Sequence, residues 1–553
     1  MKIANSIRIA ALAGLLTSAA CTGDFMDKNT NPDQATDEML SWDNLSTGSA
    51  FSQMTKNVIL SFQLTGDEEY GSASYQVIED LAGNIFAGYT GVINTSFTGY
   101  NLYNVTAKEW YNSMFNDAYT RVISAWNQLD PQREEFPEVV ALADIVKIAA
   151  MHRVTDTYGP IPYLNLSSGS INQSYDSQKE VYNRFFEELD AAISTLTSFY
   201  QGQPDTKLLA DYDNVFSGNV GNWIKFANTL RLRLALRVVY ADASLAQTQA
   251  EAALSNPVGL MTSAADLAEL KKPAIGTWEY PLYMIQYSFD DSRIGATIEA
   301  YMNGYNDPRR SKYFVVTASG EYHGVRNGIN PTAAYASSTE LSRINCTNND
   351  NLLWMTPAEA WFLRAEYELR WGSEDNARTY YEEGIRTSFS TLGVNGVDEY
   401  IADQESMPGS YTDVVNGGNS QESALASIPV CWKQGGDFET HLEQIITQKY
   451  IAMFPEGQEA WSEFRRTGYP RILTVVVNNS GGKIDTQKQI RRLNFPSTEY
   501  STNAQAVAVA ASRNGYAQQR VVEPHGRQRR YERMVGQEHE TVIQPKTGKT
   551  TEL

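Results

Sequence analysis

Amphipathic segments of helical period recur along the sequence, and they constrain its fold most tightly. Ser177 and Glu180 form the pattern of a capping box, in which the hydroxyl and the carboxylate each accept a hydrogen bond from an otherwise unpaired backbone N–H group. Apolar residues then follow at helical spacing, at Val181, Phe185, Leu189, Ile193 and Leu196. Such segments bury one stripe of each helix against a neighbour, so the sequence predicts a mainly α-helical scaffold.

The same signals predict further helices. One opens at Pro137, which a first helical turn tolerates, and stops at Gly159-Pro160. A second begins near Gly221, and a third runs from His441 to Phe454 before the chain breaks and resumes as helix. The helix near Gly221 carries arginines on the face away from its apolar stripe, at Arg231, Arg233 and Arg237.

Two of the predicted helices are joined by one tight turn. Thr356 and Glu359 form a second capping-box pattern around Pro357, and the helix that they open ends at Trp371-Gly372. A partner helix follows at once. The pair has the length of one tetratricopeptide repeat, about 34 residues, although the consensus of that repeat is absent. Small residues would let the two helices pack closely, at Ala358, Ala360 and Ala365.

The N-terminus has the pattern of an exported lipoprotein. Lys2 and Arg8 form a short positive segment before an apolar run, residues 9–20, which has signal-peptide length and is too short to span a bilayer comfortably. Small residues then lead to Cys21, as in a bacterial lipobox, where cleavage leaves a lipidated cysteine at the mature N-terminus. We therefore expect a lipoprotein signal peptide at 1–20, and a lipidated Cys21 with a polar tether at 21–45. The alternative is an ordinary secretory signal with a chance cysteine.

Charge and cysteine content limit the classes of function. The net charge is −20 over 553 residues, which disfavours nucleic acid or an anionic membrane surface as the main partner. Once Cys21 is lipidated, only Cys346 and Cys431 remain, too few for a cysteine-based zinc site or a disulfide-stapled fold. Whether these two pair stays open, and neither a cofactor nor a metal site is predicted.

Long polar loops separate the helical blocks and hold many aromatic residues. Residues 272–350 and 405–440 are rich in polar and small residues, and such loops on a helical scaffold commonly carry binding sites. A flat aromatic ring complements the apolar C–H face of a sugar, while Asn, Asp and Arg bond its hydroxyl rim. The candidate ligand contacts are Tyr89, Trp278, Tyr280, Tyr283, Tyr322 and His323.

No catalytic constellation is recognisable. The sequence lacks a His-Glu-x-x-His motif, a Gly-x-Ser-x-Gly elbow and a Gly-x-x-x-x-Gly-Lys phosphate loop. Acidic residues are abundant, however, and a glycosidase needs only two carboxylates at a suitable separation. Asp290-Asp291 could join such a pair or a calcium site, although adjacent residues do not usually point together. The chain is predicted not to be an enzyme, with an exported glycosidase lipoprotein as an alternative.

Short motifs follow one another in a fixed order along the mature chain. They include Asp156-x-Tyr158-Gly159-x-Ile161-Pro162-Tyr163, Tyr175-Asp176-Ser177-Gln178, Trp223-x-Lys225-Phe226-Ala227-Asn228, Gly457-Gln458-Glu459-Ala460-Trp461, Arg465-Arg466-Thr467-Gly468-Tyr469-Pro470 and Arg491-Arg492-Leu493-x-Phe495-Pro496. In kind and order they resemble the SusD/RagB family of nutrient-binding outer-membrane lipoproteins of the Bacteroidetes, particularly its second SusD-like branch. The resemblance implies a helical domain at 46–512, built from tetratricopeptide-like hairpins with irregular loops as the ligand face.

The end of the chain departs from that family. The family usually closes with a short helix and a Trp-Trp-Asp segment, whereas residues 513–553 are basic and polar and include Arg527-Gln528-Arg529-Arg530. We expect this tail to be disordered. One hypothesis is a frameshift, because any codons for Met534-Val535, read one base later, contain a Trp codon; resequencing the locus tests it. A nucleic-acid-binding tail is the alternative interpretation of the arginines.

The resemblance also implies a function. It predicts a lipoprotein at the cell surface, anchored in the outer membrane through Cys21, that captures a glycan or oligosaccharide. A SusC-like TonB-dependent transporter would be the partner that receives the cargo, and no nucleic acid would be bound. A peptide could replace the glycan on the same architecture. The sequence does not name the ligand, because contacts in this family come from variable loops.

Overall fold

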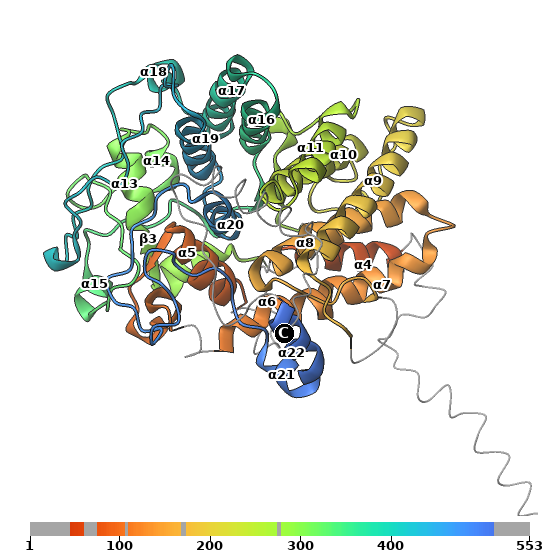
Figure 1. Cartoon of the computed structure of the whole chain (residues 1–553), viewed down its shortest axis with the longest axis horizontal. Helices are drawn as coiled ribbons and strands as arrows, with labels where there is room; N and C mark the ends of the chain where they lie inside the picture. Colours follow the sequence, from red (N-terminus) through yellow and green to blue (C-terminus); the bar gives the residue numbers. More distant parts are fainter. Residues whose placement is uncertain (1–44, 60–73, 105–108, 167–172, 274–277, 514–553) are drawn as a thin grey trace, which may run out of the picture. The chain divides into compact units, whose positions relative to one another are not determined.

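The computed structural model describes residues 45–59, 74–104, 109–166, 173–273 and 278–513 (Figure 1). The chain divides into two units, Met1–Ala50 and Phe51–Leu553, and the first is described only where helix α4 begins. The predicted signal peptide, Cys21 and its tether up to residue 44, and the tail from residue 514 lie outside the described residues, so these predictions remain untested.

Helices form most of the described chain. The α-helices are α4 (Leu45–Lys56), α5 (Ile85–Ala87), α6 (Ser113–Asp117), α7 (Ser124–Leu129), α8 (Pro137–Tyr158), α9 (Gln178–Gly202), α10 (Val220–Arg237), α11 (Ala243–Ser255), α12 (Pro281–Tyr283), α13 (Ala296–Gly304), α14 (Arg310–Tyr313), α15 (Ala333–Ser337), α16 (Pro357–Trp371), α17 (Glu374–Leu392), α18 (Val397–Ala402), α19 (Phe438–Ala452), α20 (Gly457–Thr467), α21 (Ser497–Thr502) and α22 (Ala504–Arg513). The predicted mainly α-helical fold is confirmed.

Shorter elements connect these helices. The π-helical segments are η3 (Gln76–Asn84), η7 (Ala118–Ile123) and η11 (Met284–Ser288), and the 3₁₀ turns are η4 (Thr95–Phe97), η5 (Tyr100–Leu102), η6 (Glu109–Asn112), η8 (Asp130–Gln132), η10 (Ala264–Asp266) and η12 (Gly417–Asn419). The strands pair antiparallel, β1 (Thr90–Val92) with β3 (Ser292–Ile294) and β2 (Ala268–Leu270) with β4 (Leu352–Met355). Each ladder joins chain segments that are far apart in the sequence.

Local start and stop signals set the helix ends. At α9 the backbone N–H of Glu180 donates to Ser177 Oγ at 3.3 Å, and the N–H of Ser177 donates to Glu180 Oε2 at 2.8 Å. The predicted capping box is therefore complete. Helix α8 begins at Pro137 as predicted and is followed by Gly159, whose φ of 84° favours glycine.

The second predicted capping box is only half formed. Thr356 accepts a hydrogen bond from the N–H of Glu359 at 3.3 Å, so it caps α16 as expected. The carboxylate of Glu359 does not return the bond. It accepts two hydrogen bonds from Arg233 instead, at 2.8 and 2.6 Å, because a buried arginine on α10 needs a carboxylate partner.

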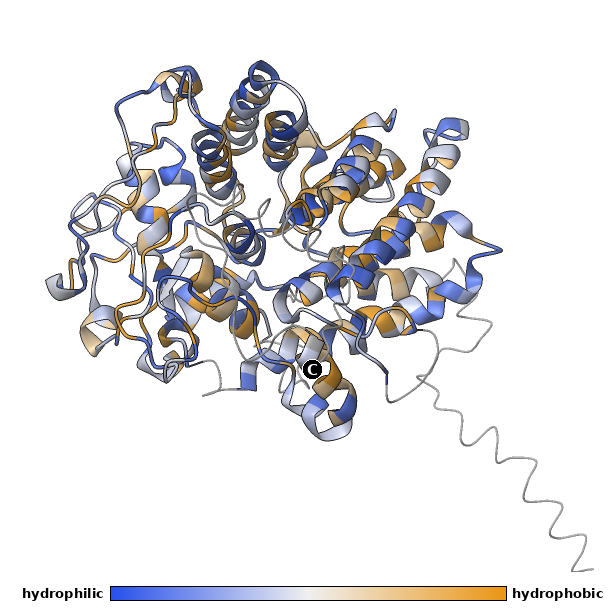
Figure 2. Cartoon of the chain, viewed as in Figure 1, coloured by the Kyte–Doolittle hydropathy of each residue, from blue (hydrophilic) through white to orange (hydrophobic). Residues whose placement is uncertain are grey.

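Helices α16 and α17 form the predicted hairpin, and α19 packs against both (Figure 1). A Cβ at Gly384 of α17 would lie 2.8 Å from the Phe362 ring, so a glycine is needed for this close approach. Helices α8, α9, α10 and α11 pack in sequence beside one another, and α10 also contacts α16. Orange and blue residues alternate along these helices, as expected for amphipathic segments with one buried stripe (Figure 2).

Ion pairs between buried side chains hold four helices of this scaffold together. We call Arg233, Arg237, Glu359, Glu366, Lys449, Glu459, Glu463 and Arg466 the buried ion-pair network. Lys449 Nζ of α19 lies 3.2 Å from Glu463 Oε2 of α20, and Arg466 Nη1 lies 2.6 Å from Glu366 Oε1 of α16. Burial alone would raise the pKa of Glu463. The charges of Arg466 and Lys449 nevertheless hold this pKa well below its usual range.

Candidate ligand-binding surface

Irregular segments meet around residues 343–345. The N–H of Val315 donates to the carbonyl of Arg343 at 2.9 Å, and the N–H of Asn345 donates to that of Tyr313 at 2.8 Å. The N–H of Ile344 donates to Gln286 Oε1 at 2.8 Å. Because these backbone groups are paired, the loops present their side chains from a defined framework although they form no sheet.

Two tyrosines and an arginine form a stack on this framework. The rings of Tyr283 and Tyr287 are 5.0 Å apart at an angle of 15°, and both side chains are half-buried. The guanidinium carbon of Arg343 lies 5.4 Å from the centre of the Tyr287 ring. We call Tyr283, Tyr287 and Arg343 the aromatic stack. It offers flat faces and a cation at the solvent boundary, which suits a ligand with apolar faces and polar edges.

Asp290 fixes the charged edge of the aromatic stack. Its Oδ1 lies 2.6 Å from Arg343 Nη2 and 2.7 Å from Arg293 Nη2. Burial tends to raise the pKa of Asp290. The hydrogen bond from Arg343 and the charge of Arg293 outweigh this effect and lower the pKa. Asp290 also has a φ of 61°, a left-handed conformation that costs energy outside glycine. The carboxylate is therefore ionised and held in one place.

Trp278 and Tyr280, which precede the aromatic stack in the sequence, occupy different environments. The half-buried Trp278 donates its indole N–H to the carbonyl of Asp350 at 3.0 Å. Tyr280 is buried, and its N–H donates to Asn348 Oδ1 at 3.0 Å. Trp278 therefore stays partly accessible. The expectation of an exposed Tyr280 ring is wrong, because the surrounding loop buries this side chain.

Tyr322 and His323 lie on the loop that follows residues 313–315. The Tyr322 ring lies 5.7 Å from the guanidinium carbon of Arg310 and is half-buried. His323 Nδ1 lies 3.6 Å from Glu299 Oε1. The nearby carboxylate of Glu299 raises the pKa of His323, while burial raises the pKa of Glu299. His323 thus faces an internal carboxylate as well as solvent.

Tyr89 is not on the surface. Its side chain has no exposed area, and its ring stacks on Tyr450 at 4.5 Å and meets Phe454 edge-on at 5.1 Å. Its hydroxyl donates to the carbonyl of Tyr450 at 2.5 Å. The expectation of an exposed Tyr89 ring is therefore wrong, because contacts with Tyr450 of α19 and with Phe454 bury it.

Tyr287 and Arg343 are absent from the predicted contacts. Tyr283 and Tyr287 are spaced i, i+4, and a helical turn places such residues on one face, so this spacing was the available signal. No pattern in the sequence points to Arg343, which comes from a segment 56 residues or more away from both tyrosines along the chain.

The adjacent acids Asp290 and Asp291 do not share a site. Asp291 is buried, and its two carboxylate oxygens accept hydrogen bonds from Asn94 and Gln76, each at 2.6 Å. Asp290 faces arginines instead. Within the described residues, no group of three or more His, Cys, Asp or Glu side chains could hold a metal ion. In the same residues Cys346 and Cys431 are separate free thiols, and no helix is long and apolar enough to cross a membrane.

A rigid helical scaffold that carries half-buried aromatic residues on hydrogen-bonded loops is the architecture of a binding protein. The family model described as SusD-like, "Susd and RagB outer membrane lipoprotein", matches residues 27–519. The chain belongs to this family, whose members are nutrient-binding lipoproteins of the cell surface.

Solved structures agree with this assignment. A chitin-binding SusD homologue from Flavobacterium johnsoniae is 34% identical, with a TM-score of 0.78 over 85% of this chain and 96% of that chain. A SusD homologue from Bacteroides uniformis is 38% identical, with the same TM-score and coverage. One from Bacteroides thetaiotaomicron is 35% identical, with a TM-score of 0.75 over 84% of this chain and 94% of that chain. No protein with a curated description matches the chain.

Proposed function

We propose that this protein captures a glycan at the cell surface and delivers it to a SusC-like TonB-dependent transporter, without cleaving it. The observation that carries the proposal is the aromatic stack, whose half-buried rings lie beside a fixed cation and a fixed carboxylate. A sugar can lay its C–H face on such a ring while its hydroxyl groups bond to Arg343 and Asp290.

The ligand surface extends from the aromatic stack to Trp278, Tyr322 and His323. Segments 278–294 and 313–323 both bond to residues 342–345, so an extended chain of sugar rings would find several contacts on neighbouring loops. The Flavobacterium relative binds chitin, so a β-linked chain of N-acetylated sugars is the first candidate cargo.

The anchor is proposed to be Cys21. A lipid at this position would hold the domain at the outer membrane, where a binding surface raises the local concentration of cargo next to the transporter. Replacing Cys21 by Ala should move the protein out of the membrane fraction while its melting temperature stays unchanged. Normal membrane fractionation of Cys21→Ala would contradict the anchor.

Calorimetry of the purified full chain against a panel of polysaccharides and peptides tests the capture role, with analysis of the products in each mixture. The panel contains chitin oligosaccharides, starch and unrelated peptides. Binding of one glycan class without cleavage supports the proposal, and co-purification with a TonB-dependent transporter supports delivery. Binding of peptides alone would replace the cargo, whereas cleavage of any panel member would overturn the non-catalytic role.

A further inference from the structure

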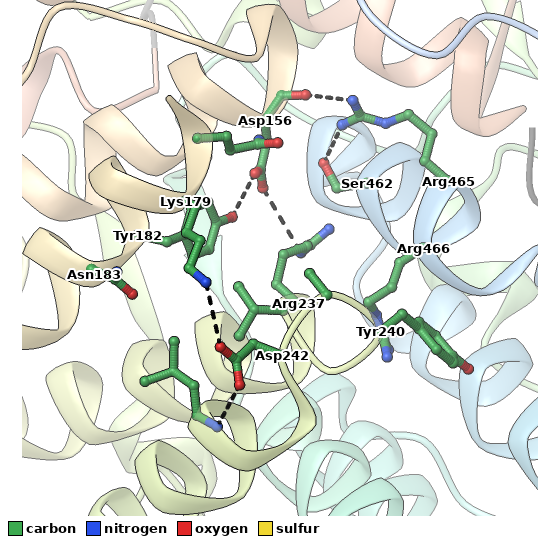
Figure 3. A pocket seen from close by; sticks show the side chains of 14 residues that line it. Asp156, Lys179, Tyr182, Asn183, Arg237, Tyr240, Asp242, Ser462, Arg465 and Arg466 are labelled. Atoms are coloured by element: carbon green, nitrogen blue, oxygen red, sulfur yellow. Dashed lines mark hydrogen bonds and ion pairs between the residues drawn. The ribbon is translucent and has the colours of Figure 1, made fainter. Parts of the chain in front are cut away.

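A cavity of about 520 Å³ lies among the helices (Figure 3). It opens between the end of α8, the start of α9, the link from α10 to α11, and α20, and none of its lining residues belongs to the ligand surface. The volume falls in the range of small-molecule sites, about 300–1,000 Å³. Motifs that are distant in the sequence meet in its lining, through Asp156, Gln178, Arg465 and Arg466.

Arg237 leaves hydrogen-bond donors unused in this cavity. Its side chain is 9% exposed, and its Nη2 contacts the carboxylate of Glu459 and lies 3.4 Å from Glu463. Its Nε and Nη1 have no hydrogen-bond partner in the part of the chain that the structure describes. Buried N–H groups without an acceptor are rare in folded proteins, because water would otherwise satisfy them. An acceptor that enters the cavity would remove this deficit.

Arg465 adds a positive charge to the cavity. Among the described residues, no carboxylate accepts a hydrogen bond from its guanidinium group. It stacks on the Trp461 ring at 3.7 Å and donates to neutral oxygens, including Ser462 Oγ at 2.6 Å and the carbonyl of Arg491 at 3.0 Å. Burial lowers the pKa of Arg465 to about 9. An anion beside it would therefore be stabilised.

The acidic groups that line the cavity each lie beside a donor or a cation. Asp156 Oδ1 accepts a hydrogen bond from the Tyr182 hydroxyl at 2.5 Å, and its Oδ2 lies 3.8 Å from Arg237 Nε. Burial raises the pKa of Asp156, while the charges of Arg237 and Arg465 oppose this shift. At the mouth, Lys179 Nζ lies 3.8 Å from Asp242 Oδ2 (Figure 3).

The remaining wall is apolar. Val238, Ala241 and Leu245 line the cavity, and the half-exposed ring of Tyr240 borders its opening. A sugar, with hydroxyl groups on every edge, would leave these hydroxyls unpaired against this wall. A ligand with one charged end and an apolar body matches both halves of the lining.

We propose that this cavity is a second binding site, which takes the carboxylate of a small organic acid. The carboxylate lies toward the free N–H groups of Arg237 and the charge of Arg465, and the apolar body lies against Leu245. The site is independent of the glycan surface. A free fatty acid and the C-terminal carboxylate of a peptide share this chemistry, and the ligands of the test separate these two sources.

The test is calorimetry of the full chain, purified in detergent, with four probes. Hexanoate stands for a free acid and N-acetylleucine for a peptide C-terminus, while hexanamide and N-acetylleucinamide are their neutral counterparts. We expect at least one acid to bind about tenfold or more tightly than its amide. Equal affinity of acid and amide for both pairs, or no binding of either acid at about 10 mM, would overturn the site.

Matched lysine variants locate the acid. Lys179→Glu reverses a charge at the mouth of the cavity, where the side chain is 74% exposed, and should weaken acid binding about threefold or more. Lys207→Glu makes the same change at an exposed lysine outside the lining and should alter it less than about twofold. Equal effects of the two variants would contradict the assignment.

A filling variant separates the two sites. Leu245→Trp places a larger ring in the apolar wall of the cavity, so it should abolish acid binding while glycan binding stays unchanged. Persistent acid binding by the folded Leu245→Trp variant would place the acid elsewhere. The ligand surface is tested by separate substitutions in its loops. If such a substitution abolishes glycan binding, the result for this cavity is unaffected.

Discussion

The helical region and the loop region treat charged side chains in opposite ways. In the helical region, Arg233 pairs with Glu359 and the side chains are 3% and 1% exposed. In the loop region, Arg343 pairs with Asp290 and the side chains are 37% and 40% exposed. Full burial makes the first pair costly to break and fixes the scaffold, whereas partial exposure leaves the second pair free to exchange water for a ligand.

Two tyrosines repeat the contrast within one residue type. The hydroxyls of Tyr89 and Tyr287 each donate to a backbone carbonyl, at 2.5 and 2.8 Å. Tyr89 is enclosed by rings of the core, while Tyr287 keeps part of its ring at the surface beside Arg343. Ring exposure, rather than the presence of an aromatic residue, therefore separates a candidate ligand contact from a core residue.

The largest expected effect comes from breaking the buried ion-pair network. Glu359→Gln removes the carboxylate that accepts two hydrogen bonds from Arg233 and lies 3.3 Å from Lys449 Nζ, so two buried cations lose a counter-charge. The free energy of unfolding should fall by about 3–5 kcal/mol, measured by urea denaturation.

The matched control is the same substitution at a surface pair. Glu382 lies 2.7 Å from Arg378, with side chains 23% and 45% exposed. Glu382→Gln should lower the free energy of unfolding by at most about 1 kcal/mol. Similar losses for both variants would show that burial does not distinguish the two regions.

The contrast between Tyr89 and Tyr287 predicts the next largest effect on stability. Tyr89→Ala opens a cavity in the core and should cost about 3–5 kcal/mol of the free energy of unfolding. Tyr287→Ala removes a half-exposed ring and should cost less than about 2 kcal/mol. Denaturant titrations of both variants check the order, and a reversed order would place Tyr287 in the core.

A Trp278 variant tests the comparison between loop and helical regions by glycan affinity. Trp278→Ala should weaken binding of the captured glycan about tenfold, which is the loss expected for one aromatic–sugar contact, with a small change in melting temperature. Trp371→Ala removes another half-buried tryptophan, at the end of α16, and should leave the affinity unchanged. A large fall in melting temperature for Trp278→Ala would instead assign that ring to the core.

The smallest expected effect is a pH dependence of the loop region. Because the nearby carboxylate of Glu299 raises the pKa of His323, the folded state holds this proton more tightly than the unfolded state. The resulting stabilisation is complete below the unfolded pKa of about 6.5 and is lost as the pH rises through the folded pKa. The melting temperature of the wild type should therefore fall slightly more between pH 6 and pH 8 than that of His323→Gln. Equal slopes would contradict the pairing.

Local signals in the sequence predicted the helices well, because caps and apolar stripes act within a few residues. Helix α9 begins with the predicted capping box, and α16 with α17 forms the predicted hairpin. The failures involve distant partners. Glu359 leaves its capping box for Arg233, 126 residues away, and Tyr89 is buried by a contact with Tyr450, 361 residues away.

The candidate ligand surface could be predicted only in outline for the same reason. The loop that carries Trp278 and Tyr283 was recognised from its composition, since long polar loops rich in aromatic residues are visible in the sequence. The position of Arg343 against Tyr287 depends on the tertiary pairing of two loops, which no local pattern encodes.

The most direct test of the division between scaffold and ligand surface compares two arginine variants in one calorimetric titration with the bound glycan. Arg343→Ala removes the cation of the aromatic stack, and Arg378→Ala removes an exposed arginine of α17. We predict binding without cleavage by the wild type, a loss of about tenfold in affinity for Arg343→Ala, and no change for Arg378→Ala. Equal affinities of the wild type and both variants, or cleavage of the glycan, would contradict the account.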